Sequence, residues 1–513
     1  MSDSQNSAEP VKDVSRDPGT DKGDRQRKAA SDGIAGLSFL IFAGIIAFFI
    51  YYVYEYTGFS SANTSVYLYM TYGANVTAGL IPYHDFFIEY PPLSLVFFTV
   101  PAFFVNNFTG TYQTDYIPYA NAYTALVYIF CLAGTAVAGL CGRKYGRSPI
   151  LLMFVFTACL CAIGPIVPKW YDIFATIPVI AAVYAYFSEH RNIAWFLLAL
   201  ATLTKLYPIL LAPVFLIPYL VDMMPHLSES RRVRTGKNKV RKSAGDIAAD
   251  KQAFTDSLKK AVIGFSIFVL TGLAVCLPLM ICDYSGFMSF LEYHSDRGVQ
   301  IESLLASFVF LGHDYGVEAF AKLPLALDYG SVNIHNDTVS SLGKCLTPLM
   351  IIVLALIYGL FLREVIRRSE KDGRFITSSE FIRNPENARL FAMTCFLAIT
   401  AFIIVGKIFS PQYIIWLFPF VSLAFLSGNA VGKSAGITKE SILAFLLFAL
   451  FIVIALMTFY IFPTHYTDLY IYESTIIHIL FIRNMCVIAA GIIAALLCRR
   501  YCSGDADPSP EKK

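Results

Sequence analysis

The sequence predicts an all-α polytopic membrane protein, and three observations lead to that prediction. Of its 513 residues, 56% are hydrophobic and only 15% are charged, whereas about 25% of the residues in a soluble domain are charged. Apolar windows of about 18 to 25 residues recur along the chain, long enough to cross a bilayer as helices. Basic clusters lie between alternate windows, as the positive-inside rule requires of a chain that crosses the membrane repeatedly.

The N-terminal segment is polar. Residues 1–33 are rich in Asp, Ser, Lys and Arg, and this composition predicts a disordered cytoplasmic tail. The first apolar window covers residues 34–54. No cleavable signal peptide precedes it, so we expect this window to serve as a signal anchor.

The rest of the chain alternates between apolar windows and polar connections. The basic clusters near residues 25–28, 143–147, 231–242, 259–260, 363–374 and 499–500 are expected on the cytoplasmic side. This orientation predicts that both termini are cytoplasmic, with a basic cytoplasmic loop at 222–260, a cytoplasmic tail at 499–513, and long outer loops at 55–116 and 283–344. The further apolar windows cover residues 117–140, 149–167, 171–187, 193–221, 261–282, 345–362, 389–405, 412–427, 440–462 and 475–497.

Two apolar segments do not fit a simple crossing. The chain is outside on both sides of residues 91–105, and about 15 residues are too few for a span, so we expect an interfacial or re-entrant helix there. Residues 193–221 begin and end near cytoplasmic charges, and about 29 residues cannot cross twice. They predict a broken hairpin interrupted at 205–208, where unwound backbone lines a cavity. We therefore expect about 10 full spans, or about 12 transmembrane helices if both hairpin arms are counted.

Two carboxylates in the first outer loop, Asp85 and Glu89, are the leading candidates for chemistry. No lysine or arginine occurs between residues 29 and 142 to neutralise them. On a helix, their spacing would place both on one face, ahead of the Pro91-Pro92 break. Apolar surroundings raise the proton affinity of a carboxylate, which suits a general base. The alternative is that both acids are solvated in a loop.

Several cations stand at the outer membrane edge, against the expected distribution of charge. Lys169, Lys205, Arg297 and Lys407 lie beside predicted span ends, three of them with aromatic neighbours. If they point into one cavity, they can hold an anionic headgroup such as a phosphate. The competing interpretation for each is ordinary snorkelling of a long side chain at the interface.

The segment 293–303 is dense in hydrogen-bonding groups. His294 could bind a phosphate or a hydroxyl, and Arg297 could form a bidentate pair with a phosphate or with Glu302. A surface loop of mixed charge is the alternative.

A turn between two later windows carries Gln412 and Tyr413, followed by Trp416. These side chains could contact a sugar, or they could belong to an aromatic belt at the interface. Asp172 begins another window, and we expect it to act first as a helix N-terminal cap.

Several kinds of catalytic site are not indicated. The sequence has no Walker loop, HExxH or GxSxG motif, and its only DxD lies at 505–507, in the C-terminal tail. The 11 cysteines show no CxxC spacing, which predicts buried thiols rather than disulfides or metal ligands. We therefore expect no metal, no cofactor and no nucleic-acid partner.

Four short runs resemble a known family. Residues 79–86 read Gly-Leu-Ile-Pro-Tyr-His-Asp-Phe and residues 89–93 read Glu-Tyr-Pro-Pro-Leu, and together they resemble the first outer loop of GT-C glycosyltransferases. Thr-Lys-Leu-Tyr-Pro at 204–208 and Ser-Pro-Gln-Tyr at 410–413 are similar to the polyprenyl-phosphate-mannose-dependent branch, glycosyltransferase family 87. The likeness runs across roughly residues 34–430. The last two windows and both tails carry no motif of the family.

The resemblance implies a GT-C-like transmembrane domain at 34–498 and a metal-independent, inverting sugar transfer on the outer face of a plasma membrane. In that fold an acidic residue after the first span is the catalytic base, which implies Asp85 here, with Glu89 orienting the acceptor. The implied donor is a polyprenyl-phosphate sugar, with mannose first and arabinose or glucose as alternatives. The implied acceptor is a lipid-linked or cell-envelope glycan. The phosphate would be held by basic side chains, namely Lys205, Arg297, Lys407 and His294.

Other classes of membrane protein compete with this interpretation. A secondary transporter or a lipid-linked sugar flippase shares the span count, the broken hairpin and the buried charges. It would more often show two related halves and acids in mid-span, whereas the acids here cluster in one outer loop. A ligase or polymerase of lipid-linked sugars would typically need one very long outer loop with paired arginines.

Overall fold

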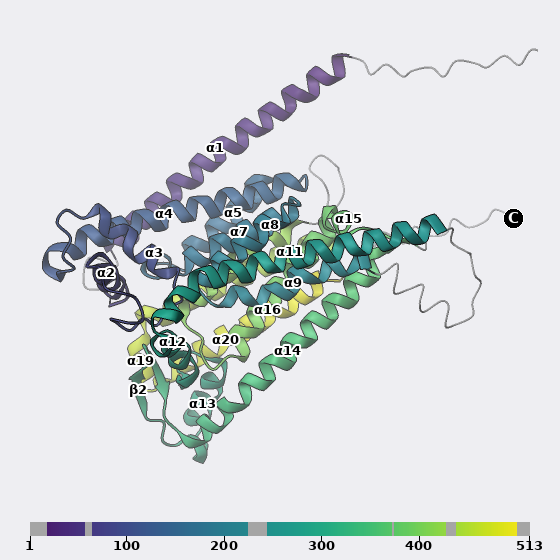
Figure 1. The fold of residues 1–513 in the computed structure, drawn as a ribbon. Coiled ribbons are helices and arrows are strands. Elements are labelled where there is room, and N and C mark those ends of the chain that lie inside the picture. The colour runs from purple at the N-terminus through teal and green to yellow at the C-terminus, as the bar shows by residue number, and fades with distance from the viewer. Residues whose placement is uncertain (1–17, 57–63, 224–243, 372–373, 427–437, 500–513) are drawn as a thin grey trace, which may run out of the picture.

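The computed structural model describes residues 18–56, 64–223, 244–371, 374–426 and 438–499, which form a helical bundle with two small sheets (Figure 1). Within these residues, seven helices are long and apolar enough to cross a membrane. This confirms the prediction of an all-α membrane protein. The seven are Ser31–Val53 within α1 (Pro18–Tyr56), α4 (Tyr112–Lys144), Phe254–Cys282 within α11 (Ala244–Cys282), α14 (Asp337–Ser369), α16 (Pro385–Val405), α18 (Lys439–Phe459) with its extension η7 (Tyr460–Thr464), and α20 (Ser474–Leu497).

The long helices differ in how much of their apolar surface the protein covers. In the apolar window of α16, 78% of the residues are buried, whereas the share is 11% in α14 and 0% in α11. Exposed apolar surface of this extent needs an apolar solvent, because water would make it an aggregation site. We therefore place α16 in the interior of the bundle and α11 and α14 at its lipid-facing rim.

Four of the expected windows form helices shorter than a full span. A 14-residue helix such as α5 or α8 is about 21 Å long, less than the roughly 30 Å of a bilayer core. The helix α7 is buried along nearly its whole length and contacts α4, α8 and η5. The four segments are α5 (Pro149–Ala162), α7 (Asp172–Phe187), α8 (Arg191–Thr204), and the run of η5 (Pro411–Leu417), α17 (Phe418–Leu423) and η6 (Ala424–Leu426).

The predicted break in the window 193–221 is present. The helix α8 ends at Thr204, and Lys205 is extended, with φ −154° and ψ 138°. The guanidinium of Arg191, at the start of α8, lies 4.8 Å from the ring centroid of Tyr219. Because Tyr219 lies near the end of the segment, its two ends meet, as a hairpin requires. The second arm consists of η2 (Tyr207–Leu211), α9 (Ala212–Leu216) and η3 (Ile217–Met223).

The segment predicted to be the first outer loop contains α2 (Thr64–Thr77), α3 (Ser94–Thr99) and η1 (Val100–Phe104). Within the segment 91–105, only Ser94–Phe104 is helical, and it is too short to cross a membrane. The Leu93 N–H donates a hydrogen bond to the Leu203 carbonyl at 2.9 Å. The loop therefore reaches inward to the break in the hairpin, as a re-entrant segment would.

The helix considered for Asp85 and Glu89 is not formed. Residues 83–85 make a turn, and Tyr83 has a positive φ of 65°. The Asp85 N–H bonds back to the Ile81 carbonyl at 2.9 Å, and no helical ladder continues toward the Pro91-Pro92 pair. The two carboxylates therefore do not share a helix face.

The segment predicted to be the second outer loop is a small mixed unit. The buried apolar residues of its part 299–334 form a hydrophobic cluster with residues of α19 (Tyr466–Tyr470) and α20. Its three-stranded antiparallel sheet has the order β1-β3-β2, with Val299 and Leu325 both opposite Ile334. The elements are α12 (Tyr284–Asp296), β1 (Val299–Gln300), α13 (Leu304–Asp314), η4 (Glu318–Phe320), β2 (Leu325–Asp328) and β3 (Ser331–Ile334).

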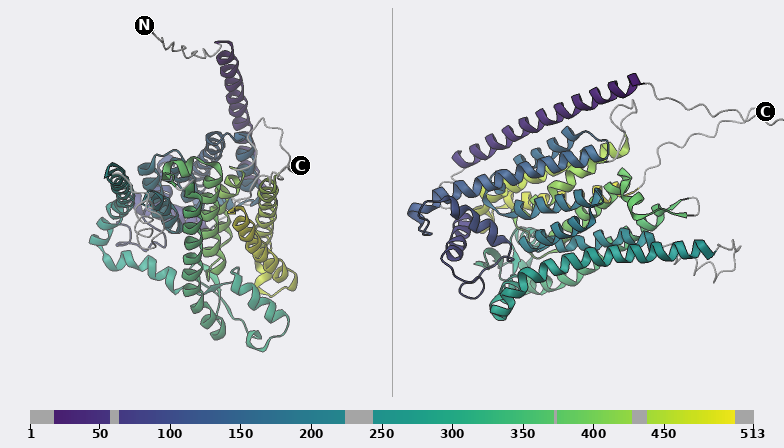
Figure 2. Two further views of the ribbon diagram at one scale, coloured as in Figure 1. Left: turned by 90° about the vertical axis from the view of Figure 1, so that its right-hand side faces the viewer. Right: turned by 45° about the horizontal axis from the view of Figure 1, so that its top comes forward.

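Figure 1 shows α2, α3, α12, α13, β2 and α19 gathered at one end of the bundle, opposite α15 (Ser378–Arg383). The remaining short elements are α6 (Ile166–Lys169), β4 (Glu370–Lys371) and β5 (Arg374–Phe375). The helix α1 extends beyond the other helices (Figures 1 and 2) and begins at Pro18. It therefore runs through half of the segment 1–33 for which we expected disorder. Residues 1–17, most of the basic loop 222–260, and the tail from 500 lie outside the described residues.

Candidate functional site

Hydrogen bonds to backbone carbonyls bring four segments together that are distant in sequence. The Nε2 of His294, near the end of α12, donates to the Glu89 carbonyl at 2.8 Å. The Gln300 N–H donates to the Lys407 carbonyl at 3.0 Å. Together with the bond from Leu93 to Leu203, these contacts assemble the first loop, the hairpin break, the α12–β1 corner and the turn after α16.

A buried ion pair lies at the centre of this assembly. The Lys205 ammonium is 2.6 Å from the Asp172 Oδ1, and the Asp172 side chain is 0% exposed. The indole N–H of Trp416 donates to the same oxygen at 2.6 Å. Asp172 does not cap α7, because Tyr171 holds the cap position and no side-chain cap bond is formed. The expectation of a capping role was wrong, since Lys205 and Trp416 take the carboxylate instead.

Aromatic rings surround the Lys205 ammonium. It lies 4.4 Å from the ring centroid of Tyr171, 5.4 Å from Trp416 and 5.6 Å from Tyr413. Tyr413 stacks on Trp416 with centroids 4.0 Å apart, and Trp416 stacks on Tyr207 at 4.2 Å. These contacts hold the cation by cation–π attraction as well as by its ion pair. Gln412, next to Tyr413, is half-buried.

Arg297, at the same assembly, has no hydrogen-bond or ion-pair partner among the described residues. It ends α12 and is only 8% exposed. Its Nε is buried without an acceptor, and within the described residues its guanidinium makes no hydrogen bond or ion pair. A buried charge without a partner is costly. The geometry therefore leaves Arg297 ready for an anion.

Glu89 lies near the cluster of basic side chains formed by Lys205, His294 and Arg297, and its charge acts on Lys205 and His294. A Cβ placed on Gly330 would be 3.0 Å from the Tyr293 hydroxyl and 3.3 Å from the Glu89 Oε2, so these two side chains meet over β-turn residue Gly330. Burial, and after it the negative charge of Glu89, raises the pKa of Tyr293 well above its usual range. Glu89 therefore supplies negative charge at the edge of the cluster.

The polar groups of His294 and Lys407 are each hydrogen-bonded to a backbone carbonyl. The Lys407 ammonium donates to the Ser295 carbonyl at 2.7 Å, near the C-terminal end of α12, where a cation is favourable. Burial, and after it the charge of Arg297, lowers the pKa of His294. A neutral His294 cannot neutralise a phosphate, and its Nε2 already holds the Glu89 loop. Both residues therefore position the segments that carry Arg297 and Glu89.

Asp85 lies apart from the cluster, on an accessible turn. Its side chain is 35% exposed, and its Oδ2 accepts the Ile81 N–H at 2.6 Å. The other oxygen, Oδ1, is 3.9 Å from His84, which in turn approaches Asp283 at 3.4 Å. The carboxylate is thus oriented by its own turn and keeps one oxygen open.

Glu302 lies in the interior of the protein. It is 0% exposed and faces Arg483 of α20 at 4.0 Å, because the turn after β1 directs it inward. Both of its carboxylate oxygens are buried without a hydrogen-bond partner among the described residues. Burial raises its pKa to about 8. The pairing of Arg297 with Glu302 that we considered is therefore not formed, and the substrate-binding role of Glu302 stays a prediction.

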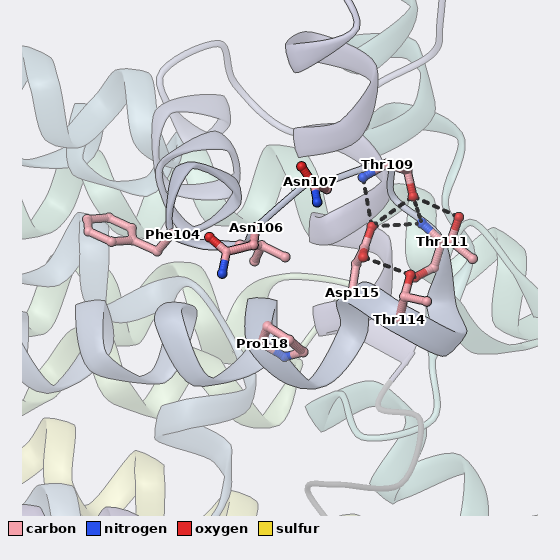
Figure 3. Close-up of a pocket in the computed structure, with 9 residues that line it drawn as sticks. Phe104, Asn106, Asn107, Thr109, Thr111, Thr114, Asp115 and Pro118 are labelled. Carbon is pink, nitrogen blue, oxygen red and sulfur yellow. Dashed lines mark hydrogen bonds between the residues drawn. The ribbon is translucent and has the colours of Figure 1, made fainter.

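A separate pocket of about 510 Å³ lies before and along α4 (Figure 3). Its acid, Asp115, accepts the N–H groups of Thr109, Gly110 and Thr111 at 2.8, 2.8 and 3.2 Å. These bonds occupy the carboxylate in holding the turn that leads into α4. None of the residues predicted from the sequence lines this pocket.

From the sequence, we gave Asp172 only a capping role and did not single out the ring of Tyr171. Both lie at the junction where a span begins, next to the flagged Lys169, and that position was the only signal. Among the described residues, no group of three or more His, Cys, Asp or Glu side chains is arranged to hold a metal ion.

No family model matches the chain, and no curated protein matches it. What the site can do follows from its side chains: a paired lysine, an unpaired arginine, and two outer carboxylates in different environments.

Proposed function

We propose that this protein is a glycosyltransferase with a GT-C-like bundle of about 10 to 12 transmembrane helices. It moves a sugar from a polyprenyl-phosphate donor to a lipid-linked or cell-envelope glycan on the outer face of the plasma membrane. Mannose, the sugar of the resembled family, is the first donor to test. The observation that carries the proposal is Arg297, a nearly buried guanidinium at the meeting point of four segments, which has no acidic partner among the described residues.

The donor phosphate fits Arg297 better than it fits the other cations. Lys205 is neutralised by Asp172 at 2.6 Å, and Lys407 is occupied by a backbone carbonyl at 2.7 Å. A guanidinium binds two phosphate oxygens at once. Negative charge grows on the phosphate as the glycosidic bond breaks, so a fixed cation there stabilises the transition state more than the ground state.

Asp85 is the general base in this proposal. Its open oxygen accepts the proton of an acceptor hydroxyl as the hydroxyl oxygen attacks the anomeric carbon. The bond between that carbon and the phosphate oxygen breaks, and polyprenyl phosphate leaves as an anion, so no strong acid is needed. Attack from the opposite side inverts the anomeric centre. Glu89, whose carboxylate lies near the Tyr293 hydroxyl, orients the acceptor.

The test is transfer of labelled mannose from polyprenyl phosphate mannose to membrane glycolipid by the purified full chain. Arg297→Gln should lower the rate by about 10²- to 10³-fold, as expected for removal of one fixed charge on the transition state. Lys322→Gln is the matched control, because Lys322 is an exposed cation of the same outer segment.

Two acid variants assign the base. Asp85→Asn should abolish transfer, and Glu89→Gln should reduce it less; Glu318→Gln, an exposed acid of the second outer segment, should leave it unchanged. Near wild-type transfer by Asp85→Asn with loss in Glu89→Gln would move the base to Glu89. Movement of the labelled lipid across the bilayer without transfer would instead identify a flippase and overturn the proposal.

A further inference from the structure

A cavity of about 460 Å³ lies among the ends of three helices, far from the outer segments. The helix α16 contacts both α14 and α20. Residues of all three helices line the cavity. This is the end of the bundle that carries α15 (Figure 1). The lining residues are Ile357, Leu360, Phe361, Arg363, Glu364 and Arg367 of α14, Leu390, Thr394 and Leu397 of α16, and Ala495, Cys498 and Arg499 at the end of α20.

One part of the cavity is apolar and open toward the lipid. Leu360 is 53% exposed, and it lies on the helix α14, whose apolar window is only 11% buried. Ile357, Leu390 and Leu397 continue the apolar wall inward. An acyl chain can therefore enter from the bilayer without losing contact with apolar surface.

The other part of the cavity carries an excess of positive charge. Its only acid, Glu364, is already bound by Arg367 at 2.7 and 3.0 Å and by Arg368 at 2.7 Å. Arg363 and Arg499 line the same cavity, and neither guanidinium makes an ion pair with a described residue. Two guanidiniums thus face the cavity, and no carboxylate of the described residues is paired with either of them.

Arg368, which is 5% exposed, holds together the helix ends that surround these charges. Its guanidinium donates to the Cys498 carbonyl at 2.6 Å and to the Asn387 Oδ1 at 3.3 Å. These bonds join the C-terminal ends of α14 and α20 to the start of α16. The cavity is therefore enclosed by tied helix ends.

We propose that this cavity binds an anionic phospholipid of the surrounding membrane. The headgroup phosphate lies between Arg363 and Arg499, and one acyl chain runs along Leu360 and Leu397. A soluble anion would leave the apolar wall in water, whereas a lipid covers it. A zwitterionic lipid would bring its own cation next to two unpaired arginines, so an acidic headgroup is favoured. This inference does not depend on the proposed sugar transfer.

The experiment titrates the purified full chain in detergent with phosphatidylglycerol and counts bound lipid by native mass spectrometry. The Arg363→Gln/Arg499→Gln double variant should bind it about 30-fold more weakly, because each basic residue near an acidic lipid contributes about a fivefold factor. The matched control, Lys144→Gln/Lys259→Gln, removes two exposed charges at the same end but outside the cavity, and should bind as wild type does.

A second variant tests the cavity without changing charge. Ala495 is exposed and lines the cavity, so Ala495→Trp can fill it without disturbing the core. It should lose phosphatidylglycerol while the Glu364 and Arg368 contacts persist. Equal binding of phosphatidylcholine, an equal loss in the Lys144/Lys259 control, or binding of glycerol phosphate as tight as that of the lipid would each overturn the inference.

Discussion

The Asp172–Lys205 pair gives the sharpest prediction about stability. The Asp172 side chain is fully buried, Lys205 is 14% exposed, and the charged atoms are 2.6 Å apart. Lys205→Met leaves the Asp172 carboxylate buried with one donor, the Trp416 indole. Removing one partner of a buried ion pair costs about 3–5 kcal/mol, so we expect a loss of that size in the free energy of unfolding.

The double variant Asp172→Asn/Lys205→Met should recover most of that loss. The Asn side-chain carbonyl can still accept the Trp416 N–H, and neither charge remains, so the cost should fall to within about 1 kcal/mol of wild type. The measurement is equilibrium unfolding in mixed detergent and dodecyl sulfate micelles, followed by circular dichroism. Exposed Lys322→Met serves as the control. The reasoning fails if Lys205→Met costs under about 1 kcal/mol, or if the double variant is less stable than Lys205→Met alone.

Three further predictions concern other parts of the fold. Burial raises the pKa of Glu302 to about 8, above the unfolded value of about 4.3. The stability that protonated Glu302 contributes is therefore present at low pH and lost as the pH rises through about 8. In thermal unfolding, Glu302→Gln should have a higher melting temperature than wild type at high pH but not in acid. Asp222 accepts bonds of 2.9, 2.6 and 2.7 Å from one serine of α11 and one of α15, so Asp222→Ala should lose about 2–3 kcal/mol in the same unfolding assay. A Cβ at Gly73 would lie 2.5 Å from the Phe98 carbonyl oxygen, whereas a Cβ at Gly272 would have nothing within 4 Å. Gly73→Ala should therefore lower the free energy of unfolding by about 1–3 kcal/mol, while Gly272→Ala should leave it unchanged or raise it by up to about 1 kcal/mol. An equal effect at both positions would contradict the packing of α2 on α3.

The sequence predicted the features that depend on local length and composition. Seven of the apolar windows form helices of spanning length, and the break at Lys205 and the short helix Ser94–Phe104 are present, because each follows from how many apolar residues lie between charges. The helix considered around Asp85 failed for a local reason that the pattern did not reveal. The turn at Tyr83, with its positive φ of 65°, took the place of the helix.

The sequence could not predict which charged side chains pair with each other. Asp172 finds Lys205 across 33 residues and Trp416 across 244, and Glu302 faces Arg483 rather than the nearby Arg297. An ion pair needs its atoms within a few ångströms, and a chain of this length offers many partners at similar sequence distances. Burial then decides which pairs persist.

The sequence alone therefore determined that this is an α-helical membrane protein with a broken hairpin, and that Asp85 and Glu89 lie in a segment without Lys or Arg, since hydropathy and charge order act along the chain. Only the tertiary structure decided that Lys205 is already neutralised, that Asp85 stands on an open turn while Glu89 adjoins the cations, and that Arg297 is left unpaired. These outcomes depend on the packing of helix ends that are distant in sequence, because electrostatic and hydrogen-bonding energies fall steeply with separation in space.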